Sequence, residues 1–235
     1  MGGGGTTYIS DMRKVLILFT HPALEKSRVN LRLAKAVRGL PGVTFHDLYE
    51  AYPNFHIDVK REQALLEAND IIVMQHPFYW YSSPALLKEW QDLVLEYGYA
   101  YGTGGEALKG KTLMNAITTG GPREAYASGG YNRFTIRQFL APFDQTARLC
   151  NMEYLAPFVV HRSLFILEDE ECRPFAEDYR RVIESLVDGS LDLAAAAQGE
   201  RINECSAGSW LAAGVTAGSG SGAETAGALV SGGAP

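Results

Sequence analysis

Nearly continuous apolar runs separated by longer amphipathic stretches mark most of the chain. The clearest runs are residues 14–20 (KVLILFT) and 70–75 (DIIVMQ), and weaker ones cover residues 43–47, 111–118 and 158–162. Continuous apolar runs of this length are typical of strands that are covered on both faces. The pattern therefore predicts five buried strands.

Between these strands the apolar residues recur at helical spacing. In residues 85–96, for example, Leu86, Trp90, Leu93 and Val94 fall on one helical face. Similar spacing predicts helices over residues 30–40, 60–68, 134–149 and 174–186. Strands that alternate with helices indicate an α/β fold with a doubly wound, five-stranded parallel sheet. Ligands of such folds bind at the carboxyl ends of the strands, so the loops after strands one, three and four deserve the closest inspection.

The ends of the chain have a different composition. Residues 1–12 are glycine-rich and predict a flexible leader, although the start also matches a myristoylation pattern with Thr6 in its last place. Residues 199–235 consist largely of Gly, Ala and Ser and predict a disordered tail, because they offer little apolar surface to bury. We therefore expect one folded domain over residues 13–198.

Composition and charge exclude several classes of protein. The 46% hydrophobic content supports a real core, and the net charge of −6 argues against nucleic-acid binding. No apolar run approaches the length of about 20 residues that spans a bilayer, and no signal peptide is visible, so a cytoplasmic location is expected. Three widely spaced cysteines and five histidines without metal-ligand spacing predict neither disulfides nor a metal site.

The first candidate loop, residues 20–30 (THPALEKSRVN), connects a strand to a helix. It has neither a G-x-G-x-x-G nor a P-loop sequence. Ser27 and Asn30 lie where the helix begins, and free N–H groups there favour an anion, to which Arg28 would add a charge. His21 is a further candidate donor. Ser27 as a simple N-cap and His21 as a packed loop residue are the alternatives.

The second candidate loop contains four consecutive aromatic residues at the end of a strand: Phe78, Tyr79, Trp80 and Tyr81. Burial of all four in the core would leave the Tyr hydroxyls and the Trp N–H in need of partners. A flat aromatic wall could instead hold a planar ligand. Packing in the core or at a dimer interface is the alternative.

The third candidate loop contains Thr118, Thr119, Gly120 and Gly121. The threonines can donate hydrogen bonds, and paired glycines allow close approach of the backbone to a ligand. An ordinary glycine-rich turn is the alternative. All three loops meet at one edge of the predicted sheet, and together a phosphate pocket, an aromatic wall and a Gly-rich edge describe a flavin site.

At this point the chain resembles the flavodoxin-like NAD(P)H:quinone oxidoreductases, most closely the ancillary flavoproteins of glutathione-gated potassium efflux (the KefF and KefG type). The resemblance covers residues 14–189 and is carried by stretches such as THPALEKSRVN, QHPFYWYSSPALLKEWQDLVLEYGYAYGTGG and ITTGGPREAY. It implies a flavodoxin-like fold, FMN as cofactor with FAD as an alternative, and NAD(P)H as co-substrate. The implied reaction is a ping-pong, two-electron hydride transfer from NAD(P)H through flavin to a quinone.

The resemblance also implies roles for particular residues. Tyr126 matches a tyrosine that assists hydride transfer, and Asn132 stands where the family has a histidine, so Tyr131 is a candidate substitute donor. The segments that would contact the flavin are the first loop at its phosphate and ribityl end, the aromatic loop along the isoalloxazine, and the Gly-rich loop at the ring. The implied cofactor-binding residues are His21, Ser27, Arg28, Val29, Asn30, Phe78, Tyr79, Trp80, Tyr81, Thr118, Thr119, Gly120 and Gly121.

Family members are homodimers with sites at the subunit interface, to which residues 97–105 would contribute. A competing reading is a regulatory ancillary subunit that activates a potassium-efflux transporter from the cytoplasmic face of the membrane, with reductase activity secondary. A receiver-type signalling domain would need acidic residues where Phe19, Thr20 and His21 stand. A one-electron flavodoxin would not need the aromatic loop or the region of Tyr126.

Overall fold

The computed structural model describes residues 12–205, which fold around one parallel sheet. Its strands are β1 (Val15–Phe19), β2 (Val43–Asp47), β3 (Ile71–Pro77), β4 (Thr112–Thr118), β5 (Glu153–Tyr154) and β6 (Phe158–Val160). The order is β2-β1-β3-β4-β5, and β6 also pairs with β4. This is the strand order of flavodoxin-like folds, so the predicted fold class is confirmed.

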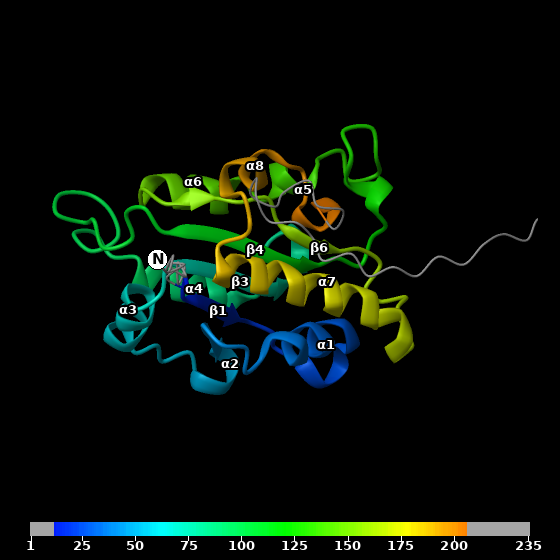
Figure 1. Cartoon of the computed structure of the whole chain (residues 1–235), viewed down its shortest axis with the longest axis horizontal. Coiled ribbons are helices and arrows are strands. Elements are labelled where there is room, and N and C mark those ends of the chain that lie inside the picture. Colours follow the sequence, from blue (N-terminus) through cyan, green and yellow to red (C-terminus); the bar gives the residue numbers. More distant parts are fainter. Residues whose placement is uncertain (1–11, 206–235) are drawn as a thin grey trace, which may run out of the picture.

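Helices cover both faces of the sheet (Figure 1). All five residues of β1 are 0% exposed, and successive side chains point to opposite faces. Val15 and Ile17 pack in one core with α1 (Arg28–Val37) and α7 (Asp169–Asp188). Leu16 and Leu18 pack in the other core, to which α3 (Val59–Glu67), α4 (Ala85–Val94), α5 (Ile136–Phe139) and α6 (Ala141–Leu149) contribute.

Three predicted helices are found within about two or three residues of their expected bounds, and two differ more. The helix predicted over residues 134–149 is divided into α5 and α6, because Pro142 lies in the first turn of α6 and cannot donate a helical hydrogen bond. The helix predicted from residue 174 begins at Asp169. Glu168 and Glu171 form a capping box there, and the acidic residues in the first turn stabilise the helix by interacting with the positive end of its dipole.

The fifth position of the sheet holds two short segments instead of one strand. Leu155 still donates its N–H to the carbonyl of Leu113 at 2.9 Å. Ala156, however, donates to the carbonyl of Ala196 in α8 (Leu193–Gln198) at 3.0 Å, and Pro157 has no N–H. The chain therefore loses its pairing with β4 over the residues between β5 and β6. The apolar pattern did not predict β5.

Short elements complete the described chain. They are α2 (Leu48–Ala51) and four 3-10 turns, η1 (Leu24–Lys26), η2 (Tyr79–Tyr81), η3 (Arg123–Tyr126) and η4 (Ile202–Cys205). Residues 199–205 belong to the predicted tail, yet Ile202 is fully buried and Asn203 hydrogen-bonds the backbone of Val159. The folded unit thus extends past residue 198. The rest of the predicted leader and tail, residues 1–11 and 206–235, lies outside the described residues.

None of the helices that the structure describes has the length and apolar character of a membrane-spanning segment.

Candidate functional site

A cavity of about 500 Å³ lies at the carboxyl edge of the sheet, within the size range of small-molecule sites. Its walls come from the loops after β1, β3, β4 and β6, so the three loops predicted to converge do meet there. The lining residues are His21, Lys26, Ser27, Arg28, Asn30, Pro77, Phe78, Tyr79, Trp80, Thr118, Gly120, Ser163, Leu164, Ile166 and Leu167.

His21 is held in one orientation by its own loop. Its Nδ1 accepts a hydrogen bond from the N–H of Ala23 at 3.2 Å, which places the ring proton of a neutral histidine on Nε2. Burial lowers the pKa of His21, against the opposing charge of Glu25. The imidazole is therefore neutral near pH 7 and can act as a hydrogen-bond donor.

Asn30 joins the first loop to the third. Ser27 caps α1 by accepting the backbone N–H of Asn30 at 3.3 Å, and the Asn30 Nδ2 donates to the hydroxyls of Ser27 at 3.0 Å and Thr118 at 2.9 Å. The Asn30 side chain is 2% exposed, yet its Oδ1 has no partner among the described residues, and neither has the Thr20 hydroxyl. Buried polar atoms are seldom left unpaired, and Asn30 lines the cavity, so a ligand there is expected to pair with its Oδ1.

The charge of the cavity is opposite in sign to that of the chain. Lys26 and Arg28 line it, and its lining contains no carboxylate, although the chain as a whole carries −6. Arg28 also donates to the carbonyl of Leu167, which ties α1 to the loop after β6. Together with the free N–H groups at the start of α1, these cations favour an anionic ligand.

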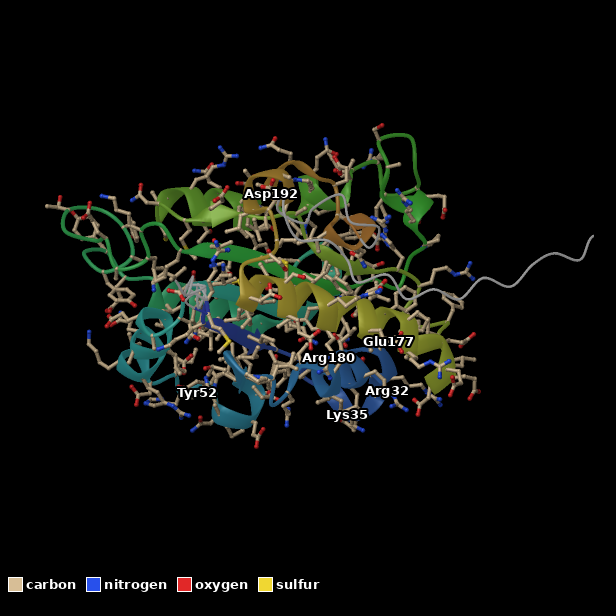
Figure 2. The ribbon with its side chains drawn as sticks, in the orientation of Figure 1. Arg32, Lys35, Tyr52, Glu177, Arg180 and Asp192 are labelled. Atoms are coloured by element: carbon tan, nitrogen blue, oxygen red, sulfur yellow. The ribbon has the colours of Figure 1, made fainter. Side chains whose placement is uncertain are left out.

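A second charged cavity, of about 370 Å³, lies between α1 and α7, and its lining carries both cations and carboxylates. It is lined by Arg32, Lys35, Glu177 and Arg180 (Figure 2), among others. Its arginines already face carboxylates: Arg32 pairs with Asp169, and Arg180 Nε lies 2.8 Å from an oxygen of Glu184. Because its charges are largely neutralised and solvent-exposed, this surface offers an anion much less than the first cavity.

The aromatic loop is only partly the predicted wall. Phe78, Tyr79 and Trp80 line the cavity, and the ring of Tyr79 meets His21 edge-on at 6.1 Å. Tyr81 is instead turned toward α5, where it stacks on Phe139 with centroids 5.1 Å apart. Trp80 and Tyr81 have φ of 51° and 63°, and Trp80 is 93% exposed. Left-handed backbone at two bulky residues is costly, and such strain is often associated with function.

The Gly-rich loop presents alternate residues to opposite sides. Thr118 and Gly120 line the cavity, whereas Thr119 and Gly121 face Tyr126. A Cβ on Gly120 would lie 3.1 Å from Leu164 Cδ1, and one on Gly121 would lie 3.1 Å from the Tyr126 ring. A side chain at either glycine would therefore displace Leu164 or the Tyr126 ring by a few tenths of an ångström.

Tyr126 lies beside the cavity rather than in its lining. Its ring meets Phe78 at 6.1 Å, and its hydroxyl hydrogen-bonds Thr119, the backbone of Gly121 and Asn132. Burial raises the pKa of Tyr126, so the phenol remains protonated near neutral pH. It lines a separate cavity of about 540 Å³.

Two further predicted residues, Val29 and Tyr131, also line neither cavity. The Val29 side chain is 2% exposed and packs in the core beneath α1, and Tyr131 is 91% exposed and lines neither of these cavities.

Sequence reasoning missed the loop after β6, which closes one side of the cavity. Its lining residues are Ser163, Leu164, Ile166 and Leu167. The rule that ligands bind at carboxyl ends of strands applied equally to this loop, because the fifth strand neighbours the fourth. Lys26 and Pro77 were also missed, although both lie in segments that were singled out.

The comparisons with known proteins agree with this architecture. Residues 13–183 match a family described as having a flavodoxin-like fold. The chain is 50% identical over 153 residues to the glutathione-regulated potassium-efflux system ancillary protein KefG of Serratia proteamaculans, covering 65% of this chain and 84% of that protein.

Two solved structures are also similar. General stress protein 14 of Treponema denticola, in complex with FMN, aligns with a TM-score of 0.70 and 40% identity over 74% of this chain and 99% of that one. An NADPH-quinone reductase of P. pentosaceus aligns with a TM-score of 0.65 and 34% identity over 72% of this chain and 96% of that one.

Proposed function

Because the chain belongs to the flavodoxin-like NAD(P)H oxidoreductase family, we propose that it is an FMN-dependent NAD(P)H:quinone oxidoreductase. The observation that carries this proposal is the cavity at the carboxyl edge of the sheet. Its lining contains two cations and no carboxylate. It also contains the buried Asn30 Oδ1, which has no hydrogen-bond partner among the described residues. FAD is the alternative cofactor that the family resemblance implies.

The residues present fit FMN at its polar end. Lys26, Arg28 and the N-terminal N–H groups of α1 would hold the phosphate, with His21 as a neutral donor. The Asn30 Oδ1 needs a donor, which a ribityl hydroxyl supplies. Phe78, Tyr79 and Trp80 would cover the ring and exclude water, and Thr118 and Gly120 would lie along its edge. Three other predicted residues do not line the cavity and would support the lining residues by packing: Tyr81, Thr119 and Gly121.

FMN held there would supply two-electron redox chemistry between NAD(P)H and a quinone. Overall, NAD(P)H, a quinone and one proton become NAD(P)⁺ and the hydroquinone, so a hydride and a proton both reach the quinone. Tyr126 would hold that proton at its hydroxyl, since burial keeps its pKa above the ordinary value. Tyr131 is a weaker candidate for this role because its side chain is almost fully exposed.

The test is reconstitution of the apoprotein with FMN, followed by assay of NADH and NADPH oxidation with and without a soluble benzoquinone. We expect quinone-dependent oxidation that requires bound FMN. Tyr126→Phe should lower kcat about tenfold or more without weakening FMN binding, while Tyr131→Phe, as the matched exposed control, should change kcat less than twofold. A protein that binds no flavin, or oxidises NAD(P)H no faster with quinone, would contradict the proposal.

We also propose a homodimer. Several large apolar side chains around the cavity are exposed, including Trp80 at 93% and Leu164 at 75%, and exposed aromatic groups of this kind mark interaction surfaces. Sedimentation analysis of the FMN-loaded chain should give twice the chain mass. A monomer at micromolar concentration would contradict this part of the proposal.

A second candidate function is that of an ancillary subunit that activates a potassium-efflux transporter at the cytoplasmic face of the membrane. The 50% identity to KefG of Serratia proteamaculans favours it, and it is compatible with reductase activity. Co-expression with a glutathione-regulated transporter should increase potassium efflux. If Asn30→Ala loses FMN but still activates efflux, the regulatory role is independent of the reductase reaction.

A further inference from the structure

His161 lies in the turn that follows β6, outside the FMN cavity and outside every motif that the sequence indicated. Its Nδ1 is 3.0 Å from the Thr119 hydroxyl, and its ring centroid is 5.6 Å from that of Tyr126. It therefore touches both the Gly-rich loop and the proposed proton donor, from a different strand of the sheet.

The hydrogen bonds of Thr119 determine which nitrogen of His161 carries the proton. The Thr119 hydroxyl has one hydrogen, and it donates this hydrogen to the carbonyl of Gly121 at 3.0 Å. The contact with His161 must then be donated by Nδ1–H. Burial, aided by Arg201 and Arg123 and opposed by Glu124, lowers the pKa of His161 to about 4. A backbone hydrogen bond with Gly121 also raises the pKa, but burial outweighs it, so the imidazole is neutral near pH 7.

Thr119 also hydrogen-bonds the Tyr126 hydroxyl. With its hydrogen committed to Gly121, its oxygen can accept from His161 and from Tyr126 at the same time. On the other side of the phenol, Asn132 accepts the Tyr81 hydroxyl through Oδ1 at 3.4 Å, which leaves its amide nitrogen to donate to Tyr126.

We infer that His161 is a positioning residue for Tyr126: by donating from Nδ1 it fixes the Thr119 hydroxyl, and through it the place and direction of the Tyr126 phenol. This inference rests on the proposed function, in which Tyr126 supplies a proton to the quinone. Without His161 the Thr119 hydroxyl is free to rotate, and the phenol loses its fixed acceptor.

A kinetic cycle tests the inference. In the FMN-loaded chain, His161→Leu should lower kcat for quinone reduction three- to tenfold, the effect of one neutral hydrogen bond, with the KM for NAD(P)H changed less than twofold. His161→Asn retains an amide donor at the position of Nδ1 and should recover at least half of kcat. In a Tyr126→Phe background, His161→Leu should cause no further loss. An equal loss in both backgrounds, or none in either, would overturn the inference.

A second measurement does not depend on turnover. Nitrogen-15 NMR of the apoprotein at pH 7 should show His161 as the neutral Nδ1–H tautomer, and Thr119→Val should shift or broaden its signals. An Nε2–H tautomer or an imidazolium would overturn the inference even if the enzyme is active. The predicted tautomer in a protein that neither binds FMN nor reduces quinones would refute the proposed function and leave the hydrogen-bond assignment intact.

Discussion

Two groups of buried polar side chains differ in how completely they are hydrogen-bonded. The first surrounds Glu62 in α3, which is 0% exposed. Its Oε1 lies 2.9 Å from His46 Nε2 and accepts the Tyr52 hydroxyl at 2.5 Å, and its Oε2 accepts Trp90 Nε1 at 2.8 Å. Tyr52, after α2, is labelled in Figure 2. Both oxygens of this carboxylate have partners within the chain.

The second group surrounds Asn30 at the cavity on the carboxyl edge of the sheet, and its hydrogen bonding is incomplete. The Asn30 Nδ2 donates to Ser27 and Thr118, but the Asn30 Oδ1 has no partner in the described chain. The comparison teaches that similar burial can serve different ends. A fully paired group stabilises the fold, whereas a partly paired group beside a cavity is suited to a ligand, because its missing bonds are costly until something supplies them.

The largest expected effect is the loss of stability when the fully hydrogen-bonded group around Glu62 is disturbed. Glu62→Gln replaces one accepting oxygen by a donor that faces other donors, so we expect the free energy of unfolding to fall by about 3 kcal/mol. Glu67→Gln, on the same helix but exposed, should change it by less than about 0.5 kcal/mol. Urea denaturation of the apoproteins measures both. Equal effects would show that the pairing of Glu62 contributes little.

Acid should reveal the same group. Burial alone would raise the pKa of Glu62, but hydrogen bonds from His46, Tyr52 and Trp90 outweigh it and hold the pKa below the ordinary 4.5. The unfolded chain therefore takes up the proton first, and the stabilisation by Glu62 is complete above that value and lost as the pH falls through the folded pKa. The stability difference between the wild-type chain and Glu62→Gln should shrink below about pH 4.5. A constant difference would contradict the account.

In the incomplete group around Asn30, a substitution should reduce ligand affinity more than stability. Asn30→Ala removes the proposed acceptor for the ribityl chain and the link between two loops, so the Kd for FMN should rise about 30-fold, or roughly 2 kcal/mol. Asn69→Ala is a matched control, since Asn69 is also buried but donates to the Leu65 carbonyl away from the cavity. It should lower stability and leave the Kd unchanged. The Kd values come from quenching of flavin fluorescence.

The smallest expected effect concerns the strained backbone beside the incomplete group. Trp80→Gly relieves the left-handed conformation at φ 51°, and relief of about 1–2 kcal/mol is partly offset by the entropy of glycine. The apoprotein should therefore become about 0.5 kcal/mol more stable while its affinity for FMN decreases. Thermal unfolding with and without FMN measures both changes. Lower stability of the apoprotein would mean that Trp80 is not strained.

The sequence predicted most of the fold because its strands are buried on both faces and leave continuous apolar runs, as in residues 14–20. It also located His21, Ser27 and Asn30, because helix capping and the strand-to-helix change are local signals. Side-chain direction was less accessible. Tyr81 turns to Phe139 because two consecutive residues adopt positive φ, and no local pattern marks that. His161 and Ser163 reach the site only through the pairing of β6 with β4, which is a long-range contact.

The most direct test of the central claim compares the affinities of the apoprotein for FMN and for riboflavin, which lacks the phosphate. If Lys26, Arg28 and the start of α1 hold the phosphate of a flavin whose ring lies against Phe78, FMN should bind at least about 100-fold more tightly, a difference of about 2.8 kcal/mol. Equal affinities would contradict the account, and so would the absence of flavin binding at micromolar concentrations.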